Sequence, residues 1–158
     1  LYGASKSAGE AAAAACPRHY VVRTAWVFGD GPNFMSTMAR LAANGTSVKV
    51  VCDQRGRPTW AEDLAKGIVH LLDVDAEYGI YNITSGGDPA SRDEIAMATF
   101  NAAGSDPTGV TPVTTAQYQE LNGPEAARPA ESTLALDKIE ATGFTPTNWR
   151  VALALYLG

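Results

Sequence analysis

The sequence has few cysteines and histidines, and it has no long apolar run. Its two cysteines, Cys16 and Cys52, cannot build a disulfide framework. Its two histidines, His19 and His70, lie too far apart in sequence to suggest a metal-ligand cluster, so no metal is expected. No stretch has membrane-spanning length or the pattern of a signal peptide. These absences favour a cytoplasmic protein with reduced thiols.

Positive charge is also scarce. The formal net charge is −5, and no stretch is rich in Lys or Arg, so nucleic acid is not an expected partner. An anionic small molecule would have to be met by a few local arginines, and the candidates are Arg23, Arg55, Arg57 and Arg128. With 158 residues, 46% hydrophobic and 18% charged, the chain can bury one substantial core.

The order of apolar patterns predicts helices alternating with strands. Helices are expected over residues 4–15, 34–43, 60–72, 91–103, 136–142 and 148–157, and strands over 20–28, 47–52, 79–84 and 110–114. Asn33 is expected to cap the second helix, and Ser91 with Glu94 forms a capping-box pattern. Polar loops are expected over 53–59 and 122–131. Such alternation predicts an α/β fold with parallel strand pairing.

The first helix carries a chemically suggestive pair, Tyr2 and Lys6. Residues four apart lie on one helix face, so both side chains can reach one small site. Carbonyl reduction needs a group that protonates the oxygen after hydride arrives. A phenol ionises near pH 10 in water, and a nearby ammonium favours its ionised form, which makes such a tyrosine a usable general acid. Because chance alone yields this spacing fairly often, the pair by itself is weak support for catalysis.

Five ordered segments resemble one known family. Segment 2–10, YGASKSAGE, resembles the active-site helix of the extended short-chain dehydrogenases, in which Y-x-x-x-K is followed by a small residue and Glu. Segment 21–29, VVRTAWVFG, is similar to the R-T-S-W-V-Y segment of the dTDP-4-dehydrorhamnose reductases. Segments 33–41, 53–59 and 128–134 resemble that family's N-F-x-x-T-M-x-R-L, D-Q-x-G-x-P-T and R-P-x-x-S-x-L. The resemblance covers essentially the whole chain.

The resemblance implies the carboxy-terminal part of a Rossmann-type parallel-sheet dehydrogenase with a small substrate-binding lobe. Residues 1–30 would end the Rossmann-type domain with the active-site helix and the following strand. Residues 31–158 would mainly form the sugar-nucleotide-binding lobe, with returning sheet elements. The amino-terminal cofactor-binding half is expected to be absent, together with its G-x-x-G-x-x-G turn, since Gly86-Gly87 lacks that spacing.

The implied activity is NAD(P)H-dependent reduction of dTDP-4-dehydro-L-rhamnose to dTDP-L-rhamnose. NADPH or NADH would be the cofactor and a sugar nucleotide the substrate, and the resemblance leaves room for a homodimer. Tyr2 would donate the proton, and Lys6 would tune it. Both Tyr2 and Lys6 would also bind the cofactor, with Lys6 holding its ribose. The backbone of Thr24 and Ala25 would face the nicotinamide. Substrate-binding residues would be Trp26, Asn33, Gln54, Arg57, Thr59 and Arg128.

Several of these residues have a structural alternative. Trp26 either lies against the sugar or belongs to the core, and Asn33 caps a helix, binds the nucleotide, or does both. The loop that carries Arg57 is either a simple turn or a phosphate site. If the binding assignment holds, Trp26, Arg57 and Arg128 should surround one cleft that also receives Tyr2. Lys49, in a separate predicted strand, is expected to be nearly silent in catalysis.

Two other functions remain open from the sequence. The chain could serve as a non-catalytic regulatory subunit that binds nucleotide without turnover. It could also belong to an epimerase or dehydratase of another sugar nucleotide, although those enzymes usually carry Asn at the position of Trp26.

The absent glycine-rich turn gives a first prediction. The 158-residue chain alone should not reduce a sugar nucleotide at a measurable rate, because nothing in it seats the cofactor's pyrophosphate. The measurement is the oxidation of NADPH or NADH by the purified chain in the presence of a 4-keto sugar nucleotide. Robust oxidation that depends on the sugar nucleotide would overturn this expectation.

Overall fold

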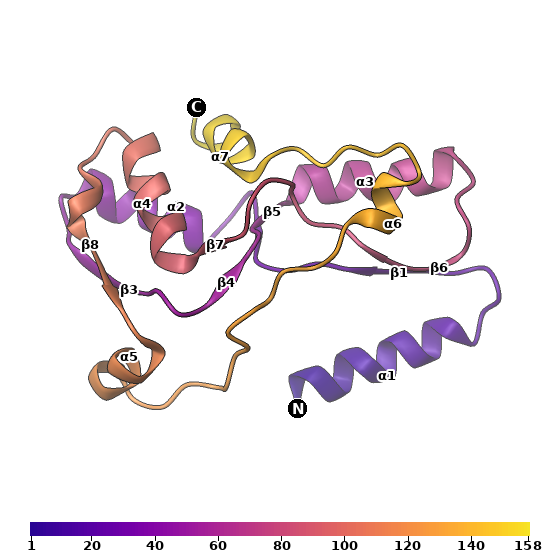
Figure 1. The fold of residues 1–158 in the computed structure, drawn as a ribbon, viewed down its shortest axis with the longest axis horizontal. Helices are drawn as coiled ribbons and strands as arrows, with labels where there is room; N and C mark the ends of the chain where they lie inside the picture. The colour runs from indigo at the N-terminus through magenta and orange to yellow at the C-terminus, as the bar shows by residue number, and fades with distance from the viewer.

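The computed structural model describes residues 1–158 and has an α/β architecture (Figure 1). The helices are α1 (Tyr2–Ala14), α2 (Phe34–Ala43), α3 (Ala61–Asp73), α4 (Arg92–Ala102), α5 (Thr115–Asn122), α6 (Asp137–Glu140) and α7 (Trp149–Leu157), with a 3-10 turn at Pro107–Gly109. The strands are β1 (Tyr20–Arg23), β2 (Val27–Phe28), β3 (Val48–Val51), β4 (Arg55–Gly56), β5 (Thr59–Trp60), β6 (Gly79–Asn82), β7 (Ala90–Ser91) and β8 (Val110–Val113).

The strands pair two by two, and most pairs are parallel. β1 pairs with β6, β2 with β5 and β3 with β8 in parallel, whereas β4 pairs with β7 antiparallel. In Figure 1, α1 lies on one side of the β1–β6 pair, and α3 and α6 lie on the other. The β3–β8 pair lies at the opposite end, beside α2 and α4. This arrangement confirms the predicted α/β class with parallel pairing.

The helix-capping signals gave correct helix starts. α2 begins at Phe34, and the Asn33 side chain accepts a hydrogen bond from the Ser36 N–H at 3.0 Å. α4 begins directly after Ser91, whose N–H donates to the Glu94 carboxylate at 2.7 Å. Each cap satisfies backbone groups that the first turn leaves without an intrahelical partner.

The predicted strand over 20–28 was wrong as a single element. The chain leaves β1 after Arg23 and resumes as β2 at Val27, with a different partner strand. Trp26 lies in the break, and its φ of 51° is in the left-handed region that non-glycine residues rarely adopt. The Trp26 carbonyl accepts the Thr59 N–H at 3.1 Å, which fixes the turn toward β5. The break therefore presents the Trp26 side chain in a direction that a continuous strand would not allow.

Two further expectations need correction, and one helix was not predicted. The segment 53–59 is not only loop, because it contains β4 and the first residue of β5. The helix expected over 136–142 shrinks to the single turn of α6. Helix α5 was not predicted at all; Asp53 ties its start to the end of β3 by accepting hydrogen bonds from the Thr115 N–H and hydroxyl. Both hydrogen bonds lower the pKa of Asp53, and the bond from the Thr115 hydroxyl has the larger effect.

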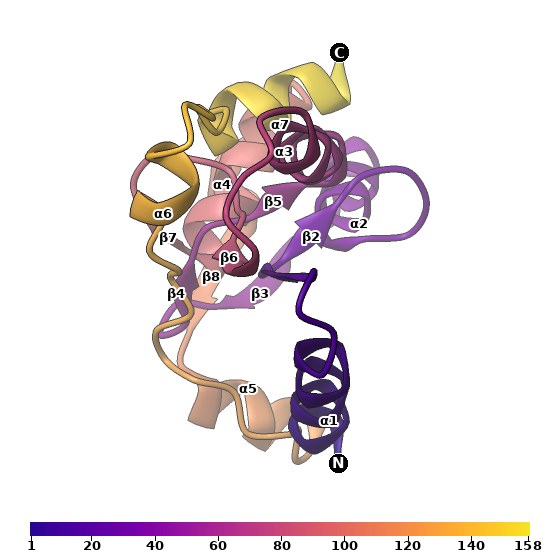
Figure 2. The ribbon, with the colours of Figure 1, turned by 90° about the vertical axis from the view of Figure 1, so that its right-hand side faces the viewer.

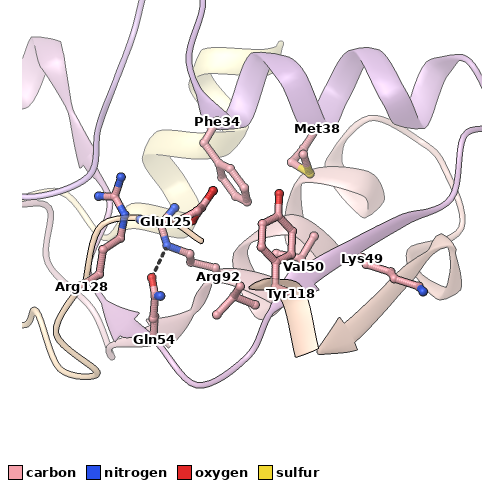
Figure 3. A pocket seen from close by; sticks show the side chains of 10 residues that line it. Phe34, Met38, Lys49, Val50, Gln54, Arg92, Tyr118, Glu125 and Arg128 are labelled. Atoms are coloured by element: carbon pink, nitrogen blue, oxygen red, sulfur yellow. Dashed lines mark hydrogen bonds between the residues drawn. The ribbon is translucent and has the colours of Figure 1, made fainter. Parts of the chain in front are cut away.

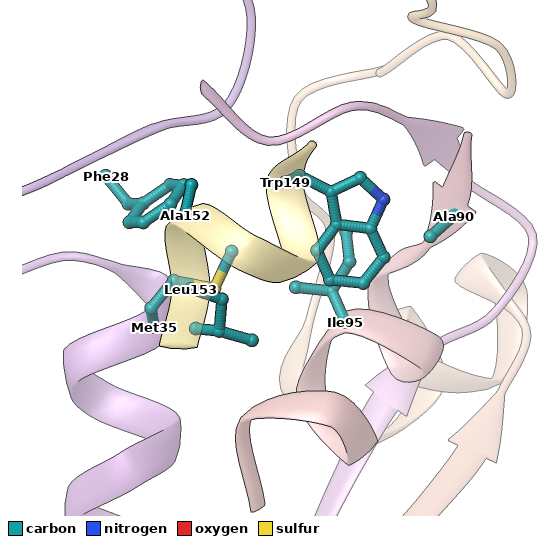
Figure 4. Close-up of a cluster of buried hydrophobic side chains, with 7 residues drawn as sticks. All are labelled: Phe28, Met35, Ala90, Ile95, Trp149, Ala152 and Leu153. Carbon is teal, nitrogen blue, oxygen red and sulfur yellow. The ribbon is translucent and has the colours of Figure 1, made fainter. Parts of the chain in front are cut away.

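One buried cluster joins the closing helix to the segments around Trp26. Its members come from β2, α2, β7, α4 and α7, and they are Phe28, Met35, Ala90, Ile95, Trp149, Ala152 and Leu153 (Figure 4). Trp26 and Phe34 pack against this cluster while remaining partly exposed. The core therefore supports the floor of the site described below. None of the helices combines the length and apolarity needed to cross a bilayer.

Candidate functional site

Two adjoining clefts share the side chains of Arg92 and Phe34. The larger one, here called the large cleft, has a volume of about 290 Å³, and the small cleft has about 80 Å³. The large cleft is lined by Phe34, Met38, Lys49, Val50, Val51, Gln54, Arg92, Tyr118, Glu125 and Arg128 (Figure 3). The small cleft is lined by Trp26, Val27, Phe28, Phe34, Met35, Pro58, Arg92 and Ile95.

Arg92 is half-buried between aromatic rings and has no carboxylate partner. Its guanidinium carbon lies 4.7 Å from the ring centroid of Trp26 and 5.9 Å from that of Phe34. Its Nε donates to the Gln54 side-chain oxygen at 3.1 Å. The three ion pairs of the chain, Arg23–Glu10, Arg55–Glu94 and Lys66–Glu62, do not include it. The charge of Arg92 is thus held by a ring face and an amide rather than by an anion.

The electrostatic setting of Arg92 is unfavourable for a cation. Burial first, and the nearby positive charge of Arg128 second, lower the pKa of Arg92, while Glu125 opposes them. Arg92 is also the first residue of α4, where the helix dipole is positive. Arg92 stays charged at neutral pH all the same, because the ordinary pKa of an arginine is far above 7. Two guanidinium groups at one end of a cleft form an arrangement that an anion would stabilise.

The two ends of the large cleft differ in chemistry. Figure 3 shows Arg128, Glu125 and Arg92 at one end and Met38, Tyr118 and Val50 toward the other. Met38 and Val50 are buried. An amphipathic ligand with an anionic portion and a flat apolar portion matches this division.

Trp26 is held by close contacts in the small cleft. The indole lies so near to Gly56 that a Cβ there would come within 3.2 Å of its six-membered ring. Any side chain at residue 56 would therefore push the indole aside. Trp26 is half-buried, so it contributes to the core edge and still presents part of its surface to a cleft. The two alternatives that the sequence left open for Trp26 are both compatible with this placement.

The predicted arginines are used in different ways. Arg23 forms a two-point ion pair with Glu10, Arg55 pairs with Glu94, and Arg57 donates to the carbonyls of Gly87 and Leu134 at 2.8 and 3.0 Å. Arg128 is exposed and lines the large cleft. Arg57 instead fastens two loops together, so among these predicted arginines the structure places only Arg128 in the cleft.

The other predicted substrate residues divide similarly. Gln54 is buried and lines the large cleft, where it orients Arg92. Asn33 caps α2 and also donates to the Gly29 carbonyl and the Tyr156 hydroxyl. Thr59 is fully buried and donates to the Ala25 carbonyl at 2.6 Å. The side chains of Asn33 and Thr59 thus make hydrogen bonds within the protein and stabilise the loops around the clefts.

The expected single cleft around Trp26, Arg57, Arg128 and Tyr2 is not formed in this chain. Trp26 and Arg128 border adjoining clefts that Arg92 bridges, while Arg57 and Tyr2 line neither. Lys49, which was expected to be unimportant, lies in the lining of the large cleft. It is therefore unsuitable as a silent control.

Tyr2 and Lys6 do share one face of α1, as their spacing predicts. The Lys6 Nζ lies 5.5 Å from the centroid of the Tyr2 ring, and Tyr2 is 77% exposed. α1 buries none of its residues, and Figure 2 shows it below the strands, at the amino-terminal end of the chain. The Glu10–Arg23 ion pair connects it to the end of β1. The two side chains therefore lie together on one exposed helix face, as the spacing predicts.

The two residues predicted to face the nicotinamide lie at the end of β1. Thr24 and Ala25 follow directly after β1, at the carboxyl end of a parallel strand, where α/β proteins bind ligands. Thr24 is exposed and its hydroxyl donates to Thr59 at 3.2 Å. Thr24 and Ala25 therefore lie at the strand end where the sequence predicted them, and Thr24 is accessible from solvent.

No seat for a pyrophosphate is formed by the paired glycines. A Cβ on Gly86 would lie 2.9 Å from the Pro146 carbonyl oxygen, and one on Gly87 would lie 2.7 Å from the Asn148 amide. These glycines therefore allow close packing of two loops rather than the approach of a phosphate. The side chains also form no cluster of three or more His, Cys, Asp or Glu positioned to hold a metal ion.

Arg92 and Tyr118 were missed by the sequence reasoning. Arg92 directly follows an N-cap serine. A positive charge at the first position of a helix is disfavoured by the helix dipole, and this unusual placement was a signal in the sequence. Tyr118 lies in α5, whose Thr114-x-x-Gln117 capping box was readable in the sequence.

Comparison with known proteins gives a consistent picture. The model of the RmlD substrate binding domain matches residues 1–158. The chain is 42% identical over 157 residues to a dTDP-4-dehydrorhamnose reductase of Mycolicibacterium smegmatis, covering 97% of this chain and 46% of that protein. A crystal structure of such a reductase from Clostridium acetobutylicum matches with a TM-score of 0.88 and 36% identity, over 99% of this chain and 54% of the other.

A second similar structure was solved with a cofactor bound. The dTDP-4-dehydrorhamnose reductase of Bacillus anthracis, in complex with NADP, matches with a TM-score of 0.87 and 34% identity. The match covers 98% of this chain and 54% of that one. The chain thus spans about half the length of the relatives that it matches.

Proposed function

Because the chain belongs to the RmlD substrate binding domain family, we propose that it provides the sugar-nucleotide site and the proton donor of a dTDP-4-dehydrorhamnose reductase. The reaction is the NAD(P)H-dependent reduction of dTDP-4-dehydro-L-rhamnose to dTDP-L-rhamnose. The names of the relatives support the reaction class, and the two clefts and the Tyr2–Lys6 pair support the division of roles within the chain.

The observation that carries this proposal is the convergence of Arg92 and Arg128 on one cleft without a carboxylate ion pair. The diphosphate of the sugar nucleotide would lie between these two groups, since charge-assisted hydrogen bonds to phosphate offset their mutual repulsion. The base would lie toward Met38, Val50 and Tyr118, and the sugar toward Trp26. This places the ligand's anionic portion at the cationic end of the large cleft.

The reductive half of the site would lie at α1 and the end of β1. Tyr2 would protonate the substrate oxygen, and Lys6 would hold both the phenol and the cofactor ribose. The Thr24–Ala25 backbone would face the nicotinamide. A bound NADPH or NADH supplies the hydride, and this chain's residues orient the ring and deliver the proton. A cytoplasmic location, which the sequence favours, stays a prediction, and a homodimer stays a possibility that the resemblance leaves open.

Loss of Arg128 tests the nucleotide site directly. The substitution Arg128→Gln should weaken dTDP binding about 10- to 100-fold, because a hydrogen bond to a charged group contributes more than a neutral one. Isothermal titration calorimetry measures the affinity. Arg40→Gln is the matched control, since Arg40 is exposed on α2 outside both clefts and the charge change is the same. Equal affinities of the two variants would reject the proposed site.

Glu125 should have the opposite effect. It lines the large cleft and its charge acts on Arg92. A carboxylate there repels the negatively charged dTDP. Glu125→Gln should therefore tighten dTDP binding about two- to five-fold, which corresponds to the free energy of interactions between exposed charges. The gain should shrink as salt is raised. Glu120→Gln, on an exposed position of α5, is the control. Weaker binding by Glu125→Gln would show that the carboxylate contacts the nucleotide favourably.

A further inference from the structure

Arg92 lies between the large cleft, which we propose for the nucleotide, and Trp26, which we propose to face the sugar. It lines both clefts, its guanidinium covers the Trp26 ring at 4.7 Å, and its Nε is fixed by Gln54. We propose that Arg92 is a positioning residue that couples the diphosphate of a bound sugar nucleotide to the orientation of Trp26. This inference rests on the proposed function, since it requires the diphosphate to bind beside Arg92 and Arg128.

The chemistry of arginine suits both contacts at once. A guanidinium is planar, so it stacks on an aromatic face while its edge nitrogens donate to phosphate oxygens. Gln54 occupies Nε only, which leaves the terminal nitrogens for a ligand. Charge-assisted hydrogen bonds to a diphosphate would fix the guanidinium plane. The indole stacked on that plane would be fixed with it.

Trp26 has little freedom to escape this coupling. Its backbone lies in the left-handed region at φ 51°, and its carbonyl is bonded to the Thr59 N–H. Gly56 approaches the six-membered ring so closely that a methyl group there would force the indole to shift by a few tenths of an ångström. The position of the indole therefore depends on the backbone at Gly56 on one contact and on Arg92, which responds to charge, on another.

The coupling would let the site distinguish ligands by their diphosphate. A compound that carries the diphosphate would fix the orientation of the Trp26 side chain. A nucleoside would fill the apolar end of the large cleft and leave that orientation unchanged. Sugar binding would then be favoured only after the diphosphate is bound.

Tryptophan fluorescence measures this coupling. The chain has three tryptophans, Trp26, Trp60 and Trp149, so the Trp26 contribution is the difference between the wild type and Trp26→Phe. dTDP and inorganic pyrophosphate should each give a saturable change in wild-type emission, and thymidine should give none. Trp26→Phe should lose the emission change at dTDP concentrations that calorimetry shows to be saturating for that variant.

Variants of Arg92 separate charge from stacking. Arg92→Lys keeps the charge but not the plane, so at saturating dTDP it should lose most of the Trp26 signal. Gln54→Ala removes the partner of the Arg92 Nε together with a hydrogen bond to the Thr115 hydroxyl, and it leaves Arg92 itself in place. It should reduce the same signal and serves where Arg92→Lys does not fold. A full signal in the folded Arg92→Lys protein, or in Gln54→Ala where that variant stands in, would overturn the coupling.

The result with the wild type distinguishes the two levels of inference. Binding of dTDP by calorimetry without a change at Trp26 would overturn the coupling and leave the proposed nucleotide site intact. Absence of dTDP binding would overturn both. A thymidine response equal to that of dTDP would show that Trp26 senses the base and would also overturn the coupling.

Discussion

The substitution Tyr2→Phe is expected to lower kcat by about 10²- to 10⁴-fold, the usual contribution of a general acid, in an enzyme that joins this chain to a cofactor-binding half. The change deletes a single hydroxyl from a side chain that is 77% exposed, so the fold of the chain should be unaffected. KM should change little, because the lost interaction acts on the transition state.

Lys6→Met should lower kcat and also weaken cofactor binding, since one ammonium serves both. Steady-state kinetics with NADPH and with NADH measures both effects. The matched controls are Tyr78→Phe, which removes a phenolic hydroxyl that accepts a hydrogen bond from Arg18, and Lys66→Met on the exposed face of α3. Turnover of Tyr2→Phe at the wild-type rate would show that another group supplies the proton.

Local rules predicted the features that depend on near neighbours in sequence. The spacing of Tyr2 and Lys6 gave their shared helix face, and the Lys6 ammonium does lie 5.5 Å from the Tyr2 ring. The N-cap signals at Asn33 and Ser91 gave the starts of α2 and α4. These features follow from helical geometry and backbone hydrogen bonding, and both act within a few residues.

Features that depend on distant contacts were not predictable in this way. The strand pattern over 20–28 gave no sign that Trp26 breaks it, because the break is fixed by Thr59, far along the chain. The choice among the arginines is similar. Arg57 is held by the carbonyl of Leu134, 77 residues away, whereas Arg92 is bonded only through its Nε, to Gln54, and its terminal nitrogens stay available. The sequence alone could not decide which guanidinium would be free, since tertiary packing makes that choice.

The largest effect on stability is expected from Trp149→Ala. Trp149 is 1% exposed at the start of α7, and its Nε1 donates to the Asp88 carbonyl at 3.0 Å. Its ring packs with Ile95 and the rest of the cluster beneath the small cleft. Truncation leaves a cavity and a carbonyl without its donor, so we expect the free energy of unfolding to fall by about 3–5 kcal/mol.

For a chain of this size that loss corresponds to a fall in Tm of roughly 6–20 °C, measured by the thermal unfolding of both proteins. Leu155→Ala is the matched control, because Leu155 lies on the same helix but is 61% exposed, and it should change Tm little. Because the cluster supports Trp26 and Phe34, dTDP at about 100 times its Kd should restore roughly 2.7 kcal/mol wherever the variant still binds it. An unchanged Tm in Trp149→Ala would mean that α7 does not belong to the cooperative core, and the cluster could then not be what holds the two clefts in place.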